Sequence, residues 1–258
     1  MNVLITPYLD VALLTLYAFF LFFLGLVVYL RREDRREGYP LEDEMSGRLD
    51  TMGGPLLQAS PKTFRLPFGH GTVTTPTKGR EPVEIAARRI DRFAGAPYAP
   101  TGDPLVDGIG PAAWAERARR PDLDWEGHPR IAPLSAGDQF WIASGDPDPR
   151  GYAVVAADGR TVGTVSDLWI DRADRLIRYI EVSLGDVAGR GVLAPMFMAT
   201  VERGRRRVVI DAINAEQFAR VPAPEGERVL TLYDEERIQA YYGGGYLYAS
   251  RDRQEPFL

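Results

Sequence analysis

Two short stretches of the chain gather side chains that can carry protons. The first is Asp171–Asp174, followed by Arg178 and Glu181, and the second is Asp124–His128, which holds one of the two histidines. Carboxylates and imidazoles at hydrogen-bond spacing relay protons when burial or like-charge crowding lifts a carboxylate pKa towards neutrality. Taken alone, the same residues are also typical of a polar turn with a surface ion pair and of a solvated loop.

The composition of the 258-residue chain narrows the chemistry further. The chain has no cysteine, which excludes disulfides, iron–sulfur clusters, cysteine-ligated zinc and cysteine nucleophiles. A formal net charge of −5 argues against nucleic acid as a partner, because general nucleic-acid binders need a basic surface. The sequence shows no glycine-rich phosphate loop and no nucleophile elbow. We therefore expect a protein that is not itself an enzyme.

An N-terminal apolar run predicts a membrane anchor. The 20 residues Val11–Leu30 carry no charge, and as a helix they span about 30 Å, the thickness of the bilayer core. Four arginines, at positions 31, 32, 35 and 36, follow the run, and residues 1–10 contain no Lys or Arg. The positive-inside rule then places residues 1–10 in the periplasm and the rest in the cytoplasm. A cleaved signal peptide is the alternative, but it would have a basic start and a shorter core.

The remaining chain divides into an extended segment and a β-rich body. Proline recurs through residues 31–105, which predicts little regular structure beyond short strands over 63–66, 71–75 and 83–87. We expect this segment to lie along the membrane or a partner, and residues 106–258 to form the cytoplasmic domain.

Within that body, short strands predict a small antiparallel barrel. They are expected over 152–157, 160–171, 175–184, 192–194 and 207–213. A short helix over 234–242 should follow, ended by Gly243–Gly245. Strand alternation would put Asp174 and Arg178 on one face with Ile180 and Val182.

The most distinctive motif of the chain is YLRREDRREGYPLE at Tyr29–Glu42, directly after the apolar run. Further distinctive segments follow it in the order PKTF (Pro61–Phe64) with Leu66-Pro67, PTGDPLVDGIGPAAWAER (Pro100–Arg117), GDPDPRG (Gly145–Gly151), GTVSDLWIDR (Gly163–Arg172), RYIEV (Arg178–Val182), EQFARVP (Glu216–Pro222) and AYYGGGYLYA (Ala240–Ala249). In this order the segments resemble the H subunit of purple-bacterial photosynthetic reaction centres, a family with a PRC-type barrel.

The resemblance implies a structural subunit with one transmembrane helix. Such a subunit caps the two pigment-binding subunits on the cytoplasmic side of the photosynthetic membrane, stabilises the complex and shapes the proton path to the secondary quinone. Bacteriochlorophyll, bacteriopheophytin, quinones and non-haem iron would belong to those partners, and a core antenna would be a further neighbour. A membrane-anchored barrel that serves as an adaptor for another partner remains the alternative.

The resemblance also implies roles for both acidic stretches. The proton-pathway positions of the family map onto Asp171, Asp174 and Arg178, and we group Glu181 with them. The family often has an acid and two histidines at a proton-uptake point that also traps divalent metals. Asp124 and His128 match that pattern, whereas the first histidine is replaced.

Glu126 stands in place of that histidine, which changes the chemistry of the uptake point. A free Glu titrates near pH 4.3 and a free His near 6.5, so the group still carries protons but at another pH. With one imidazole fewer, Asp124, Glu126 and His128 are only a weak candidate for a metal site.

The basic run after the membrane helix is a candidate contact surface. Arg31, Arg32, Arg35 and Arg36 could bind anionic lipid headgroups, and the ring of Tyr39 could rest at the headgroup level or against a partner. Orientation of the helix alone, without a specific lipid, would equally explain these arginines.

Overall fold

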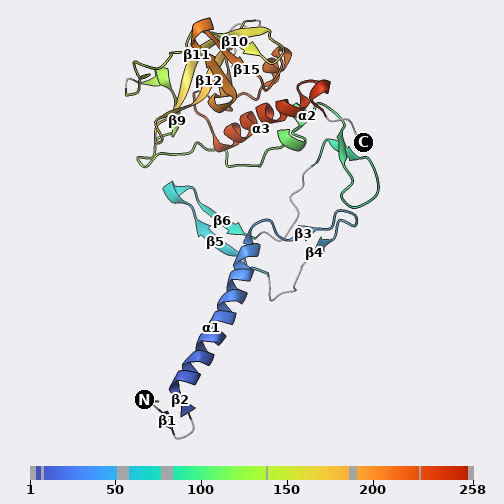
Figure 1. The fold of residues 1–258 in the computed structure, drawn as a ribbon, viewed down its shortest axis with the longest axis vertical. Helices are drawn as coiled ribbons and strands as arrows, with labels where there is room; N and C mark the ends of the chain where they lie inside the picture. Colours follow the sequence, from blue (N-terminus) through green and yellow to red (C-terminus); the bar gives the residue numbers. More distant parts are fainter. Residues whose placement is uncertain are drawn as a thin grey trace. The chain divides into compact units, whose positions relative to one another are not determined.

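The chain forms two units in a computed structural model (Figure 1). The structure describes residues 4–6, 9–50, 58–76, 84–137, 139–185, 191–226 and 228–254. The first unit comprises Met1–Val83 and Asp91–Pro97, and the second comprises Glu84–Ile90 and Tyr98–Leu258. Each unit is described by itself below.

The first unit is built around the long helix α1 (Val11–Glu33), which a 3-10 turn extends to Arg36. The Asp10 carboxylate caps its start by accepting a hydrogen bond from the Ala12 N–H at 2.9 Å. Its most apolar stretch has a mean hydropathy of 2.7 and no buried residue. Within the described residues α1 is the one helix long and apolar enough to cross a membrane, as the sequence predicted.

Short two-stranded ladders accompany α1. Strands β1 (Leu4–Thr6) and β2 (Leu9–Asp10) precede it, and β3 (Leu41–Glu42) with β4 (Leu49–Asp50) follows it. The hairpin of β5 (Lys62–Arg65) and β6 (Thr72–Thr75) confirms two of the expected strands. The third expected strand, over 83–87, falls partly outside the described residues. Within the described part, residues 84–86 are not in a strand, and the strand there begins only at Ala87.

The second unit is a seven-stranded sheet with a helix packed on it (Figure 1). The sheet order is β13-β12-β11-β10-β15-β14, and β9 pairs with the end of β11. A separate ladder joins β7 (Ala87–Arg89) to β8 (Tyr98–Pro100). The strands of the sheet are β9 (Ile131–Pro133), β10 (Ala153–Ala156), β11 (Thr161–Asp171), β12 (Leu176–Leu184), β13 (Gly191–Pro195), β14 (Ala199–Glu202) and β15 (Arg207–Ile210).

One strand pair departs from the antiparallel pattern that we expected. Strands β10 and β15 run parallel, with Ala153 opposite Arg207. A 3-10 turn of three residues, Met196–Met198, carries the chain from β13 at one edge to β14 at the other edge without reversing it. The β14–β15 hairpin therefore brings β15 back in the direction of β10. In the described part of the chain, β13 and β14 form no ladder with each other, so the barrel stays open there.

The C-terminal helix is longer than the sequence suggested, because its glycines do not end it. Helix α3 runs from Leu232 to Tyr248, with Gly243–Gly245 inside it. A side chain at Gly244 would come within 2.4 Å of the Cβ of Ala112, and one at Gly245 within 2.3 Å of the Ala212 carbonyl oxygen. The glycines thus allow α3 to approach the chain beneath it. The short helix α2 (Pro104–Asp107) also contacts α3.

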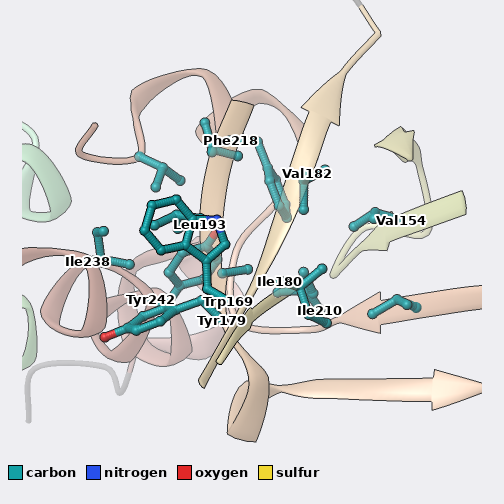
Figure 2. Close-up of a cluster of buried hydrophobic side chains, with 14 of the residues drawn as sticks. Val154, Trp169, Tyr179, Ile180, Val182, Leu193, Ile210, Phe218, Ile238 and Tyr242 are labelled. Atoms are coloured by element: carbon teal, nitrogen blue, oxygen red, sulfur yellow. The ribbon is translucent and has the colours of Figure 1, made fainter. Parts of the chain in front are cut away.

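The core of the second unit lies between the sheet and α3. Figure 2 shows Ile180 and Val182 of β12 and Val154 of β10 in this cluster, with Ile238 and Tyr242 on α3. All five side chains are fully buried. Burial of this apolar surface fixes the position of α3 against the sheet, and with it the position of the acidic first turn of α3.

Candidate functional site

The site is built around a carboxylate at the end of a strand. Asp171 is the last residue of β11, and its side chain is 0% exposed. Strand β9 pairs with this end of β11, with Ile131 opposite Asp171. Because Arg130 directly precedes β9, its side chain lies beside the Asp171 carboxylate, and the Arg130 carbonyl accepts a hydrogen bond from the Arg172 N–H at 2.9 Å.

Two arginines and two backbone groups hold Asp171. The Arg130 Nε lies 3.0 and 2.9 Å from its two carboxylate oxygens, and the Arg178 Nε lies 3.2 Å from Oδ2. The N–H groups of Ala173 and Asp174 donate to Oδ1 at 3.0 and 2.9 Å. Burial raises the pKa of Asp171, but the hydrogen bonds from Arg130 and the Asp174 N–H outweigh it and leave the pKa below its usual range.

Asp174 lies at the solvent side of the same arginines. Its Oδ2 is 2.5 Å from the Arg130 Nη2 and 3.8 Å from the Arg178 Nη2, and its side chain is half exposed. The structure therefore brings Asp171, Asp174 and Arg178 together, and adds Arg130.

A bulge explains how Arg178 reaches this position. The register between β11 and β12 moves from Trp169 opposite Tyr179 to Ile170 opposite Ile177, so Arg178 has no partner in β11. A bulge re-aims the side chain of the extra residue. The alternation that we used to place Arg178 on the face of Ile180 and Val182 is interrupted at Arg178 itself, so the strand pattern no longer supports that placement and it stays a prediction.

A second carboxylate, on helix α3, lies within electrostatic range of Arg178 and Asp171. Glu235, in the first turn of α3, accepts a hydrogen bond from the Tyr179 hydroxyl at 3.1 Å, and that hydroxyl accepts one from Gln239 at 2.8 Å. Burial raises the pKa of Glu235, and the charges of Asp122 and Asp171 add to the rise. The Tyr179 hydrogen bond and the charge of Arg178 oppose the rise without cancelling it.

Sequence reasoning missed Glu235 and Arg130. From the sequence, the acids at the start of α3 indicate only the first turn of a helix, and Asp234 does accept the Thr231 N–H in the cap. A raised carboxylate pKa depends on what covers the side chain, and the sequence does not show that cover. We refer to Asp122, Arg130, Asp171, Asp174, Arg178 and Glu235 as the Asp171 cluster.

The second acidic stretch forms a tight loop. The Asp124 Oδ1 accepts hydrogen bonds from the N–H groups of Glu126 at 3.0 Å and His128 at 2.9 Å. The His128 Nδ1 lies 3.5 Å from a Glu126 oxygen and 3.8 Å from Asp124. The Glu126 and His128 side chains are about half exposed, whereas Asp124 is buried. The backbone hydrogen bond from His128 lowers the pKa of Asp124, against the effect of its burial.

The loop and the Asp171 cluster are joined through the backbone. The Arg130 N–H donates to the Asp122 carbonyl at 2.8 Å, and the Asp122 carboxylate lies 3.5 Å from the Arg130 Nη1. A bridge between Leu123 and Pro129 closes the loop at its base. The loop of residues 122–130 therefore begins and ends at the cluster, and its tip carries the exposed side chains of Glu126 and His128.

Glu181 lies apart from this group. Its carboxylate accepts hydrogen bonds from the Trp169 Nε1 at 2.9 Å and from the Ser166 hydroxyl at 3.2 Å. These contacts tie β12 to β11 across the sheet. Glu181 therefore stabilises the pairing of the two strands. Its partners here are not part of the Asp171 cluster, and they do not support the predicted role of Glu181 in proton transfer.

Among the described residues, the Asp124 loop is the candidate site for a metal ion. One ligand atom from each of Asp124, Glu126 and His128 falls within 4.8 Å of the others. The Asp124 Oδ1 already accepts two backbone N–H groups, which leaves fewer lone pairs for a metal. The donor set is mixed and mostly exposed, so a metal there stays a prediction.

The four arginines at the end of α1 differ in their contacts and in their exposure to solvent. Arg36 is buried, and its guanidinium donates to the carbonyls of Ser60 at 2.8 Å and Thr75 at 2.7 Å. Arg32 donates to the Ser60 hydroxyl at 3.1 Å. Arg35 lies 5.7 Å from the centre of the Tyr39 ring. Arg31 is exposed, which leaves it best placed of the four for a lipid headgroup.

Two family matches cover most of the chain. Residues 3–136, a little over half of it, match the family described as photosynthetic reaction centre, H-chain N-terminal region. Residues 143–217, which include β10 to β15, match the PRC-barrel domain. The first match contains α1, the β5–β6 hairpin and the Asp124 loop, and the second contains Asp171, Asp174 and Arg178.

Proposed function

The chain belongs to the family of photosynthetic reaction-centre H chains, and from that premise we propose that it conducts protons to the secondary quinone. The protein is a membrane-anchored subunit, as the family and the apolar helix α1 indicate. In our proposal it caps the two pigment-binding subunits from the cytoplasmic side and stabilises the complex. Bacteriochlorophyll, bacteriopheophytin, quinones and non-haem iron lie in those partners, and the N-terminus is periplasmic.

One observation carries the proposal, namely that a single loop links exposed titratable side chains to the charged cluster around the buried Asp171. Glu126 and His128 stand in water at the tip of the loop, and Asp122 and Arg130 stand at its base. Arg130 then contacts both Asp171 and Asp174. Ordered water between these groups would complete a relay of the kind that carboxylates and imidazoles support.

The cluster residues take different parts in this relay. We assign Asp171 a positioning role, because two arginines and a lowered pKa keep it ionised and hold the guanidinium groups in place. Asp174, half exposed and paired with the same arginines, is the first proposed proton carrier. Glu235 is the second proposed carrier, since a raised pKa moves a carboxylate towards the pH at which it exchanges protons.

Flash kinetics on assembled reaction centres test the proposal. We expect Asp174→Asn to slow the proton-coupled second reduction of the secondary quinone and to leave the first charge separation unchanged. Asp148→Asn is the matched control, because Asp148 is also a half-exposed aspartate paired with an arginine, Arg150, but lies outside the cluster. Asp174→Glu should restore the rate, since it restores a carboxylate.

A second-electron rate equal to wild type in Asp174→Asn would remove Asp174 from the rate-limiting path. Assembly itself is checked by near-infrared absorption of the purified complex. An eluate without bacteriochlorophyll bands from intact photosynthetic membranes would instead favour an adaptor for another partner.

A further inference from the structure

The β5–β6 hairpin has one polar face and one apolar face. Antiparallel pairing sets Phe64 opposite Val73 and Thr63 opposite Thr74. Residues directly opposite each other share a face, and successive residues alternate between faces. Phe64 and Val73 therefore lie on one face with Lys62 and Thr75. The other face carries only Thr63, Arg65, Thr72 and Thr74, with a hydrogen bond of 2.8 Å between the Thr63 and Thr74 hydroxyls.

The large side chains of the apolar face are about half exposed. Phe64 is 45% exposed, Val73 48% and Phe68 at the tip 58%. The Phe68 backbone also takes the left-handed conformation, with φ of 56°, which a bulky residue adopts only under constraint. An isolated two-stranded hairpin is at best marginally stable in water, so a surface that covers this face is expected.

Contacts at the base of the hairpin determine how the face with Phe64 and Val73 is oriented relative to α1. The Lys62 ammonium lies 2.8 Å from a Glu33 carboxylate oxygen and 5.7 Å from the centre of the Tyr29 ring. Tyr29 is one turn before Glu33, on the membrane side of α1. The Lys62 side chain therefore reaches back along the helix towards the apolar run.

Arg36 joins the same face to the helix end. Its guanidinium lies 6.0 Å from the centre of the Phe64 ring, and the Thr75 hydroxyl donates to the Arg36 carbonyl at 3.0 Å. The Lys62 and Thr75 side chains thus meet the end of α1 on the face that also bears Phe64 and Val73. The hairpin branches from this end of α1 (Figure 1).

We propose that the β5–β6 hairpin lies in the lipid headgroup layer, with its Phe64 and Val73 face turned to the bilayer. Through Lys62 this face meets Tyr29, at the end of the apolar run of the candidate membrane helix α1. Aromatic side chains favour the membrane interface, and the Lys62 ammonium favours anionic headgroups. The occupant is thus a lipid surface that contains an anionic phosphate headgroup, and the inference does not depend on proton conduction.

The natural absence of cysteine makes a direct test possible. Single-cysteine variants Val73→Cys and Thr72→Cys place one fluorescent label on neighbouring residues of β6 that face opposite ways. The full-length chain is reconstituted in phosphatidylcholine–phosphatidylglycerol vesicles. Quenching by bromine on the lipid chains and by aqueous iodide is then measured. Gly25→Cys calibrates a site inside the bilayer, because an added side chain there meets nothing.

We expect bromine to quench the Val73 label several-fold more than the Thr72 label, and iodide to show the reverse order. Phe64→Cys and Arg65→Cys should repeat the contrast on β5. Equal iodide quenching of both labels would overturn the proposal. Protection of the Val73 label from iodide without bromine quenching would also overturn it, since a protein surface would then cover this face.

Discussion

The end of β11 and the first turn of α3 each place a carboxylate under the influence of the Arg178 charge, and the two carboxylates differ in their pKa. Asp171 is fully buried, yet its pKa is lowered. Glu235 is only partly buried, yet its pKa is raised. Burial acts in the same direction on both, so burial does not explain the difference.

The difference comes from the donors that each carboxylate accepts. Asp171 accepts two guanidinium groups and two backbone N–H groups, all of which favour its charged form. Glu235 accepts one neutral hydroxyl, from Tyr179, and faces two other acids. Charged and convergent donors therefore separate a fixed anion from a group that can exchange a proton.

Removing the charge of Asp171 should have the largest effect on stability. Asp171→Asn leaves Arg130 and Arg178 without their buried counter-charge, and we expect it to lower the free energy of unfolding by about 3 kcal/mol at neutral pH. Denaturant unfolding of the full chain in detergent, followed by tryptophan fluorescence, measures this loss. Asp148→Asn, at an exposed ion pair, is the control and should cost under about 1 kcal/mol.

The pH dependence of that loss checks its cause. A lowered carboxylate pKa contributes stability that is present above the unfolded pKa, near 3.9, and is lost as the pH falls through the folded pKa. The gap between wild type and Asp171→Asn should therefore close under acid conditions. A gap that stays constant down to low pH would show that shape, and not charge, sets the cost.

Removing the charge of Glu235 should have a smaller effect of the opposite sign. A raised carboxylate pKa means that stability is present below the unfolded pKa, near 4.3, and is lost as the pH rises through the folded pKa. Glu235→Gln keeps a hydrogen-bonding side chain without the charge. At acid pH we expect it to lie within about 1 kcal/mol of wild type, and to gain on wild type as the pH rises.

The same unfolding assay, repeated across the acid to neutral range, measures this trend. Glu236→Gln is the matched control, because Glu236 is the adjacent carboxylate but pairs with Arg117 at 3.3 Å. If Glu235→Gln lost stability relative to wild type as the pH rose, the contrast between Glu235 and Asp171 would fail.

Much of the fold could be predicted because local pattern decided it. The charge-free run of α1 and the strands of the β11–β12 hairpin follow directly from residue type and spacing. The parallel pairing of β10 with β15 could not be predicted, because it depends on whether the turn at Met196–Met198 reverses the chain. The length of α3 was missed because glycine ends helices in exposed positions but permits close packing in buried ones.

Only those site residues that are close to one another in the sequence could be predicted. Asp171, Asp174 and Arg178 stand within one hairpin, so their neighbourhood followed from strand order. Arg130 and Glu235 reach them through β9 pairing and through the packing of α3, both of which are long-range. The local bulge at Arg178 also escaped the alternation rule, because a bulge has no residue signature here.

The smallest effect is expected at Asp124, where backbone groups take the place of arginines. Its lowered pKa depends first on the His128 N–H, and its Oδ1 also accepts the Glu126 N–H. An asparagine oxygen can accept the same two hydrogen bonds. Asp124→Asn should therefore unfold close to wild type and lose much less stability than Asp171→Asn, whereas Asp124→Ala, which removes the acceptor, should lose more than Asp124→Asn. Equal losses in the Asn and Ala variants would mean that charge holds this loop too, and the distinction between neutral and charged donors would no longer separate the two regions.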